Sequence, residues 1–377
     1  MIKTMIYRFA TLAMILLAGS ACVRLEVLTT VSEDVPVSFS TYGMRPLGAK
    51  AGSSYVASGS NFAVGAVMGV YGFYHDNSTW EADSTAGTNI PDFMYNQAVT
   101  KDNAGWEYSP VKYWPNEYGS NAVNGDVDRL SFWAYYPHNA SGLTFPAYTN
   151  TASSLPRAHF IVDSDISDQV DLMFSDLQKN LYKNDAAGHG HVSDGEVLFT
   201  FRHALSLVQF EVTTNSGSLP EGSVVDISSI SLTNVNSAGD CLNPLAPVTR
   251  DEDAAAYWTS VGTPVTITLS SGSGSDSNLI LMPQTLVQEG STGHSATKLT
   301  ISFSIGFPAA DDPTATITYG PTTVERYLWS DVASPAYGIK RWLPGRKYVY
   351  GVVIGLEEIE FSEVFTETWT LQSETNL

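Results

Sequence analysis

Residues 197–212 read VLFTFRHALSLVQFEV, and the pattern of this stretch governs how the rest of the chain is interpreted. Val197, Phe199 and Phe201 alternate with their neighbours, and a period of two predicts a strand with one face against a core. After a break at residues 202–204 the chain is again apolar and rich in strand-forming residues. The stretch therefore predicts two strands, or one long broken strand, at the seam between two β-domains.

The segments before this stretch read as short strands between polar loops. Residues 35–40 form a predicted first strand, and Pro36 favours an edge position because proline cannot donate to a ladder. Residues 62–74, FAVGAVMGVYGFY, predict a buried strand because three glycines and an aromatic end argue against a helix. Residues 75–89 predict a polar loop, and residues 177–182 predict one helical turn.

Aromatic side chains crowd two segments of the first half, residues 106–115 and 130–137. Each ring can bury a large apolar area, so we predict that these rings form core contacts and cross-strand pairs. An exposed aromatic platform that binds sugars is the alternative interpretation.

The segments after residue 212 predict a run of short strands. Gly/Ser clusters such as residues 270–277 separate them. Strands at this spacing, with turn residues between them, predict an all-β chain with antiparallel sandwich architecture. The predicted strands are residues 224–234, 264–269, 279–283, 298–307, 314–319, 346–354 and 359–369.

The composition is that of an extracellular β-protein. Only 15% of the residues are charged, against about a quarter in typical soluble domains. The 39 acidic residues outnumber the 19 basic residues, which gives a formal net charge of −20. Such a balance disfavours nucleic acid and anionic lipid surfaces as partners, and it keeps a secreted protein soluble.

The N-terminus predicts export. Lys3 and Arg8 flank an apolar run that is followed by small residues and then by Cys22. A positive start, an apolar run too short to span a bilayer and small residues before a cleavage site are typical of a signal peptide, here residues 1–21. The cysteine directly after the small residues predicts a lipoprotein, with Cys22 as the lipidated first mature residue. An ordinary signal peptide is the alternative.

Catalytic and metal-binding patterns are missing from the sequence. With Cys22 acylated, Cys241 has no partner cysteine in the chain, so neither a disulfide nor a thiolate metal site is predicted. His189 and His191 are one residue apart, but without further ligands we interpret them as part of a solvated loop. No nucleophile elbow or zincin motif is present. We therefore expect no catalytic, cofactor-binding or metal-binding residues, and no enzyme.

Nine short motifs follow one another along the chain. They are Cys22, VPVSFS (35–40), YWP (113–115), FWAYYP (132–137), DLM (171–173), FRHALS (201–206), LMPQ (281–284), PGRKYVY (344–350) and Trp369 near the C-terminus. In this order they resemble the fimbrillin family, the pilin-like lipoproteins of the type V pili of Bacteroidia. The resemblance spans nearly the whole mature chain.

The resemblance implies a fold and a mode of assembly. It implies two transthyretin-like antiparallel β-sandwich domains in tandem, which we assign to residues 22–195 and 196–377. In that family a protease removes the N-terminal strand of an exported lipoprotein, and a donor strand from the next subunit fills the vacated groove. A missing strand leaves an apolar groove with unpaired edges, which an extended segment can fill. A head-to-tail contact of this kind does not close, so it builds a filament.

The resemblance also implies maturation sites. The family's protease is often Arg-specific, and Arg45 is the only arginine between the first and second predicted strands. Pro46 follows it, and trypsin-like proteases resist such a bond, so Lys50 before Ala51 is an alternative site. Ser84, in Asp83-Ser84-Thr85, fits a short O-glycosylation pattern of these bacteria.

The implied function is that of a structural subunit (shaft, tip or anchor) of a type V cell-surface pilus that supports adhesion. The expected partners are other pilus subunits, the outer membrane through the lipid on Cys22, and host or bacterial surface ligands, without any cofactor. The alternative is a surface lipoprotein that does not polymerise and that binds glycans through exposed aromatic side chains. Residues 359–369 are either a donor strand or the last strand of their own domain.

Overall fold

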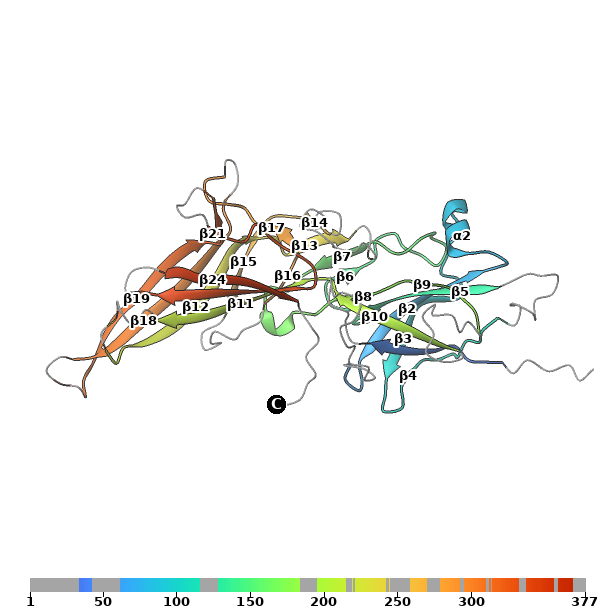
Figure 1. The fold of residues 1–377 in the computed structure, drawn as a ribbon, viewed down its shortest axis with the longest axis horizontal. Helices are drawn as coiled ribbons and strands as arrows, with labels where there is room; N and C mark the ends of the chain where they lie inside the picture. The colour runs from blue at the N-terminus through green and yellow to red at the C-terminus, as the bar shows by residue number, and fades with distance from the viewer. Residues whose placement is uncertain are drawn as a thin grey trace, which may run out of the picture.

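The computed structural model shows an elongated, almost entirely β molecule whose two halves lie end to end (Figure 1). One short helix, α2 (Trp80–Ala86), and one 3-10 turn, η3 (Ile166–Asp168), interrupt the strands of the described part. The structure describes residues 34–42, 62–115, 128–183, 195–214, 219, 221–241, 244, 258–269, 279–291, 295–309, 312, 314–331, 337–355 and 359–368.

An eight-stranded sheet forms the first half. In spatial order its strands are β2 (Val67–His75), β3 (Met94–Lys101), β4 (Trp106–Glu107), β1 (Ser38–Tyr42), β10 (Glu196–His203), β8 (Met173–Ser175), β5 (Arg129–Tyr136) and β9 (Gln178–Leu181). The strands β2 and β5 also pair with each other, so the sheet closes on itself.

Alternation along these strands gives the closed sheet two apolar faces. Val70 and Phe132 belong to one buried cluster, which also holds Phe39 and Phe199 and fills the interior of the sheet. Tyr71 and the next residues in the alternation point to the other face and join a second cluster, which includes strands of the second half. Because side chains alternate with a period of two, one sheet supplies both cores.

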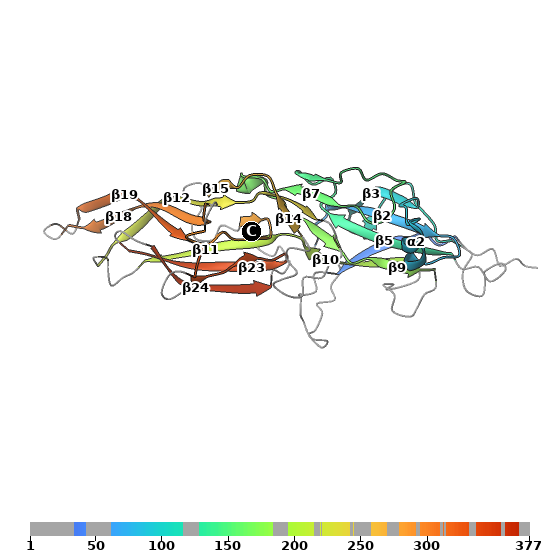
Figure 2. The ribbon, with the colours of Figure 1, turned by 90° about the horizontal axis from the view of Figure 1, so that it is seen from above.

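The second half is a two-layered sandwich, seen edge-on in Figure 2. Its core holds Phe210, Leu232, Ile301, Tyr350 and other side chains from both layers. One layer is β16 (Leu279–Leu281), β11 (Ser206–Thr214), β23 (Arg346–Ile354) and β24 (Ile359–Thr368); the other is β15 (Val265–Leu269), β12 (Val224–Val235), β18 (Lys298–Pro308) and β19 (Thr316–Tyr327). Two short antiparallel pairs complete it: β17 (Gln284–Thr285) with β22 (Arg341–Trp342), and β20 (Trp329–Ser330) with β21 (Tyr337–Gly338).

A small antiparallel sheet, with strands from both halves, joins the two halves. Its order is β14-β13-β7-β6, with β6 (Leu143–Thr144) and β7 (Ala158–Ile161) from the first half, and β13 (Ala238–Cys241) and β14 (Trp258–Val261) from the second. The pairing of β7 with β13 therefore carries main-chain hydrogen bonds from one half to the other.

The structure confirms two of the predicted strands and replaces a predicted helical turn with a strand. The predicted break in the central stretch is confirmed, because β10 ends at His203 and β11 begins at Ser206. The buried strand predicted for residues 62–74 is present as β2, although it starts only at Val67. The helical turn predicted for residues 177–182 is wrong, since β9 occupies this segment and pairs with β5.

Two further differences concern the strand directions and the first strand. Most pairs are antiparallel as predicted, but β1 pairs in parallel with β10, and β11 pairs in parallel with β23. The edge position predicted from Pro36 is wrong: β1 lies between β4 and β10. Pro36 is tolerated because it precedes β1 and forms only an isolated bridge with Tyr113.

The boundary predicted between residues 195 and 196 falls directly before β10. This strand pairs with β1 and β8, which both come from the first half. The next strand, β11, pairs with β16 and β23 of the second half. The chain therefore passes from one half to the other between β10 and β11.

Candidate functional site

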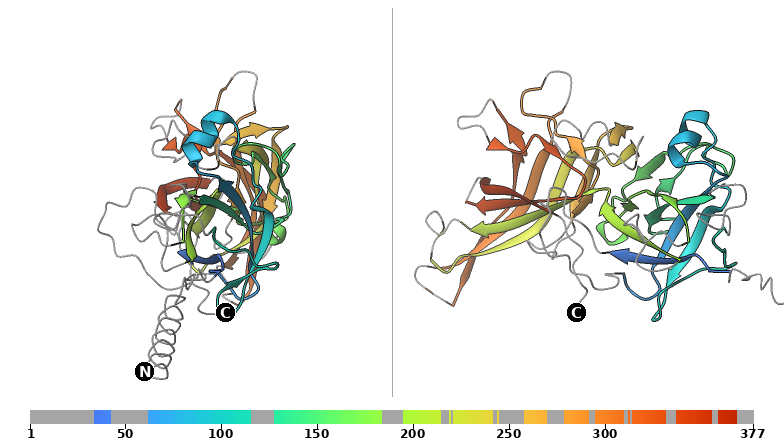
Figure 3. Two further views of the ribbon diagram at one scale, coloured as in Figure 1. Left: turned by 90° about the vertical axis from the view of Figure 1, so that its right-hand side faces the viewer. Right: turned by 45° about the vertical axis from the view of Figure 1, so that its right-hand side comes forward.

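The most unusual element of the first half is its N-terminal strand. β1 completes the closed sheet by inserting between two strands that come much later in the chain, and Figure 3 shows it as the dark blue strand in the wall of the first half. It pairs in parallel with β10 from Ser38↔Glu196 to Tyr42↔Thr200, and antiparallel with β4 at Phe39↔Trp106. Both of its edges are therefore used.

Main-chain hydrogen bonds hold the segment before β1 in the same way. The Val37 N–H donates to the Lys112 carbonyl at 2.9 Å, and the Trp114 N–H donates to the Val35 carbonyl at 3.0 Å. On the other side, the Ser38 N–H donates to the Gly195 carbonyl at 2.9 Å. The strand is thus held on both sides along its length, by the kind of bonds that any extended segment could make.

The side chains of Val37 and of β1 alternate between two faces. Val37, Phe39 and Thr41 point inward and are only 2%, 4% and 4% exposed, whereas Ser38 is exposed on the outer side. Inward apolar residues alternating with small polar ones are what a strand with one buried face requires. We call the space that these three inward side chains occupy, between β4 and β10, the first-strand groove.

Phe39 fills an aromatic pocket in this groove. Its ring stacks on Phe199 with centroids 5.5 Å apart and an interplanar angle of 16°. The ring of Phe132 meets it edge-on at 5.7 Å, and the ring of Tyr108 lies 5.5 Å away at a tilt. Offset stacking and edge-on contacts of this kind add to the gain from burial.

Thr41 makes a buried polar contact between side chains in the groove. The buried indole N–H of Trp106 donates to the Thr41 hydroxyl at 3.2 Å. A buried donor needs a partner, because leaving it unpaired costs about 1–3 kcal/mol. The groove therefore offers an apolar position, an aromatic position and a hydrogen-bond donor in a fixed order.

Gly195 closes the N-terminal end of the groove. Its carbonyl accepts hydrogen bonds from the Ser38 main chain, from the Ser38 hydroxyl at 3.3 Å and from the Trp114 indole at 3.0 Å. Gly195 has φ +82°, and an added Cβ would lie 2.6 Å from the Val35 side chain. Only glycine fits this conformation without strain.

Ser84 lies on α2. The residue is exposed, and its hydroxyl accepts a hydrogen bond from the Asn89 side chain at 2.6 Å. The sequence predicted a polar loop here, but Thr79 caps a helix whose end is closed by Gly87. This cap pair was a readable signal.

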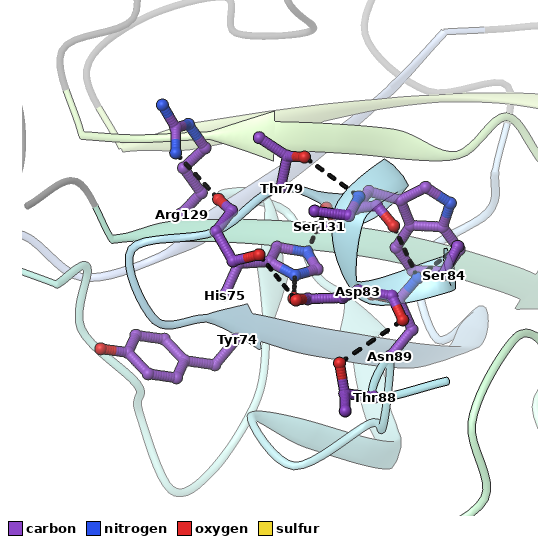
Figure 4. Close-up of polar contacts among 12 residues, drawn as sticks. Tyr74, His75, Thr79, Asp83, Ser84, Thr88, Asn89, Arg129 and Ser131 are labelled. Atoms are coloured by element: carbon purple, nitrogen blue, oxygen red, sulfur yellow. Dashed lines mark hydrogen bonds and ion pairs between the residues drawn. The ribbon is translucent and has the colours of Figure 1, made fainter. Parts of the chain in front are cut away.

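The neighbouring Asp83 anchors α2 to the sheet (Figure 4). Its carboxylate lies 2.6 Å from His75 Nδ1 and accepts from the Ser78 hydroxyl at 2.7 Å, and His75 Nε2 lies 2.8 Å from the Ser131 hydroxyl. Burial raises the pKa of Asp83, but the hydrogen bonds from Ser78 and His75 outweigh burial and hold the pKa below its usual value of 3.8. Since His75 and Ser131 are fully buried, this Ser-His-Asp arrangement secures the helix and offers no nucleophile to solvent.

The remaining predicted site residues fall into two groups. Cys22, Arg45, Lys50, His189 and His191 lie outside the described residues. The crowded aromatic side chains are mostly core, as predicted. Trp106, Trp114, Phe132, Trp133 and Tyr135 are buried, and of the residues 106–115 and 130–137 only Tyr113 is an exposed ring, at 50%.

Within the described part of the chain, no group of three or more His, Cys, Asp or Glu side chains could hold a metal ion. No helix there has the length and apolar character needed to cross a membrane. Cys241 is fully buried in the apolar cluster shared by the two halves, which agrees with a structural role for this thiol.

The comparisons with known proteins agree with this geometry. The sequence profile of the fimbrillin-like family matches residues 56–369. The chain belongs to the fimbrillin-like family. No curated protein matches this fimbrillin-like chain.

Two solved structures share the fold of the fimbrillin-like chain. A fimbrial protein from Bacteroides vulgatus superposes with a TM-score of 0.60 at 16% identity, covering 89% of this chain and 100% of that one. A candidate cell adhesion protein from Bacteroides uniformis superposes with a TM-score of 0.53 at 17% identity, covering 91% of this chain and 100% of that one. Membership of the fimbrillin-like family points to a fimbrial or adhesive role at the cell surface.

Proposed function

We propose that this fimbrillin-like protein is a structural subunit, shaft, tip or anchor, of a type V cell-surface pilus that assembles by β-strand exchange and supports adhesion. The observation that carries the proposal is the first-strand groove. A strand from the very start of the described chain, hydrogen-bonded on both edges, completes the sheet of the first half.

Loss of β1 would leave an apolar groove between two unpaired strand edges, and another strand could bind there. The edges of β4 and β10 would lose their partners, and the aromatic pocket around Phe39 would open to water. Unpaired edges and an exposed apolar groove both bind an extended segment, the edges through main-chain hydrogen bonds and the groove through alternate side chains. A second subunit that offers such a strand would restore the sheet and link the two chains.

Release of β1 requires a cut between it and the next strand. Arg45 and Lys50 lie in the sequence between Tyr42, where β1 ends, and Phe62. Cleavage after either residue would detach β1 together with the lipidated Cys22. A chain that escapes cleavage would stay anchored in the outer membrane with its groove filled, as befits an anchor subunit.

The proposal also covers export, domain organisation, glycosylation and partners. The protein is exported as a lipoprotein with residues 1–21 as its signal peptide and is carried on the outer membrane by Cys22. The two halves, divided after β10, are transthyretin-like domains in tandem. Ser84, exposed on α2, is an O-glycosylation site, and the partners are other pilus subunits and host or bacterial surface ligands.

The test uses protein recovered from the native cell surface. Under mild SDS without boiling, we expect bands that contain this chain joined to further subunits and that collapse to the monomer on boiling, because an exchanged strand dissociates slowly. Intact mass of the chain in those bands should show an N-terminus after Arg45 or Lys50 for a shaft or tip subunit, and an acylated Cys22 for an anchor. Recovery of the chain as a monomer alone would overturn the proposal.

A further inference from the structure

The first-strand groove constrains which side chains a bound strand can have at three alternating positions. The interior side requires an aliphatic residue where Val37 lies, an aromatic residue where Phe39 lies and a hydroxyl where Thr41 lies. The third requirement is the strictest, because a hydrophobic pocket tolerates a change of size better than a buried donor tolerates the loss of its acceptor.

Phenylalanine followed two residues later by serine or threonine is rare in this chain. Of the phenylalanines after Cys22, only Phe39 meets this condition. Among the strands that the structure describes, β24 is the last in the chain, and it lies at the edge of its sheet and pairs with β23 alone. Its sequence is IEFSEVFTET.

No register of β24 satisfies the groove. With Phe361 in the place of Phe39, Ile359 fits the first position, but Glu363 falls on the position of Thr41. With Phe365 there, Glu363 and Glu367 fall on the first and third positions. A carboxylate at a position that is 4% exposed would lose its hydration for a single indole donor, and burying a charge without full compensation is costly.

If the opposite face of β24 points into the groove, the hydroxyl is present but the aromatic ring is missing. A register with Thr366 at the position of Thr41 supplies the hydroxyl, but it places Val364 where Phe39 lies. The aromatic pocket formed by Phe199, Phe132 and Tyr108 would then be only partly filled. Underfilling a pocket costs the lost burial together with the remaining cavity.

We infer that the first-strand groove selects a strand of a different subunit, with the pattern aliphatic-x-aromatic-x-Ser/Thr, and rejects the C-terminal strand of this chain. The inference rests on the proposed strand exchange and adds its specificity. The chain is then the acceptor in a heterotypic contact, with Trp106 as the residue that reads the hydroxyl. The net charge of −20 also disfavours contact between two copies of the chain.

The test measures peptide exchange on the folded full-length chain. A recognition site for a sequence-specific protease replaces part of residues 46–50, and after cleavage fluorescent peptides compete with β1 for the groove. Binding is followed by anisotropy, and release of β1 is followed by native mass spectrometry. The peptides are residues 35–42, the same peptide with Thr41→Val or Thr41→Ser, residues 357–364, and the last peptide with Glu363→Thr.

The side chains that line the groove predict the order of the peptide affinities. The 35–42 peptide and its Thr41→Ser form should bind with similar affinity, while Thr41→Val should bind at least about fivefold more weakly because it leaves a buried donor unpaired. The 357–364 peptide should bind at least about tenfold more weakly than 35–42, and Glu363→Thr should recover most of this loss. In a Trp106→Phe chain, which has no indole donor, the Thr41→Val penalty should disappear.

Two failures are distinguishable. If no peptide enters the groove, including 35–42, strand exchange itself is wrong, and the proposed function falls with the inference. If 35–42 exchanges but 357–364 binds equally well, or if the Thr41→Val penalty persists in the Trp106→Phe chain, the proposed function stands and the selection rule is overturned.

Discussion

Gly195 contacts the segment that leads into the first strand, so adding a Cβ at this position tests how much that contact contributes to stability. Gly195→Ala forces an alanine to adopt φ +82° and brings its Cβ within 2.6 Å of Val35 and 3.0 Å of the Pro36 carbonyl. We expect a loss of about 1–2 kcal/mol from the backbone conformation and a further 1–3 kcal/mol or so from crowding. Gly262→Ala is the matched control, since Gly262 has the same φ of +82° but no heavy atom within 4 Å. Urea denaturation measures both variants, and equal losses would contradict the contact with the first strand.

Asp83 gives a prediction about acid stability. Its pKa is lower in the folded protein than the usual 3.8, so its carboxylate contributes stability that is present above this value and is lost as the pH falls through the folded pKa. Asp83→Asn should lower the free energy of unfolding at pH 5 by about 1–3 kcal/mol. The loss should be smaller at pH 3, which is below the usual pKa of 3.8, because the unfolded chain then already binds the proton. Urea titrations at both pH values test this. Asp76→Asn, at an exposed neighbouring residue, is the control and should change the free energy of unfolding little. A loss for Asp83→Asn that is equal at both pH values would contradict the role of the ionised carboxyl.

The elements that the sequence predicted well are those whose pattern is local. The alternation before residue 202 and the renewed apolar run after it marked β10 and β11, because the period of a half-buried strand is visible in a few residues. The aromatic crowding before residue 137 marked a core for the same reason. Position in the sheet is not local, so Pro36 suggested an edge, although strands from residues 106–107 and 196–203 flank β1.

β9 and α2 show how tertiary contacts override local preference. Residues 177–182 have apolar side chains at a helical spacing, yet β9 pairs with β5, and Asn180 adopts φ +59°. Asn180 accepts from the Trp80 N–H at 2.7 Å and donates to Glu81 at 2.8 Å, while Lys179 forms an ion pair with Glu81. These contacts fix the short helix and the strand together, and no window of sequence contains both partners.

The candidate site was predictable in part for the same reason. Val37 and Phe39 could be recognised as a strand face from alternation alone, but the acceptor role of Thr41 depends on Trp106, which lies 65 residues further along the chain. The resemblance supplied the idea of a removable first strand. The depth of its burial, its parallel pairing with β10 and its polar contact came only from the three-dimensional arrangement.

The two halves share a core, and this has a consequence for how the molecule unfolds. The sheet β14-β13-β7-β6 takes strands from both halves, and one apolar cluster holds Phe174 of the first half with Trp258 and Met282 of the second. His159 lies 2.6 Å from Asp240 across the β7–β13 pair. A shared sheet and core resist separation of the two halves better than a flexible linker would, as the proposed pilus subunit would need under tension.

Trp258→Ala should therefore weaken both halves together. The indole of Trp258 donates to the Ala204 carbonyl at 2.7 Å, at the point where the chain passes from β10 to β11, and it stacks on Phe174 with centroids 6.4 Å apart. Removing it should lower the free energy of unfolding by about 3–5 kcal/mol. Hydrogen exchange should show faster opening of β5 in the first half and of β12 in the second, within one thermal transition. Val224→Ala, at a side chain that is 68% exposed, should leave both unchanged. Acceleration confined to one half would mean that the halves unfold independently and that the sheet shared between them does not couple their stability.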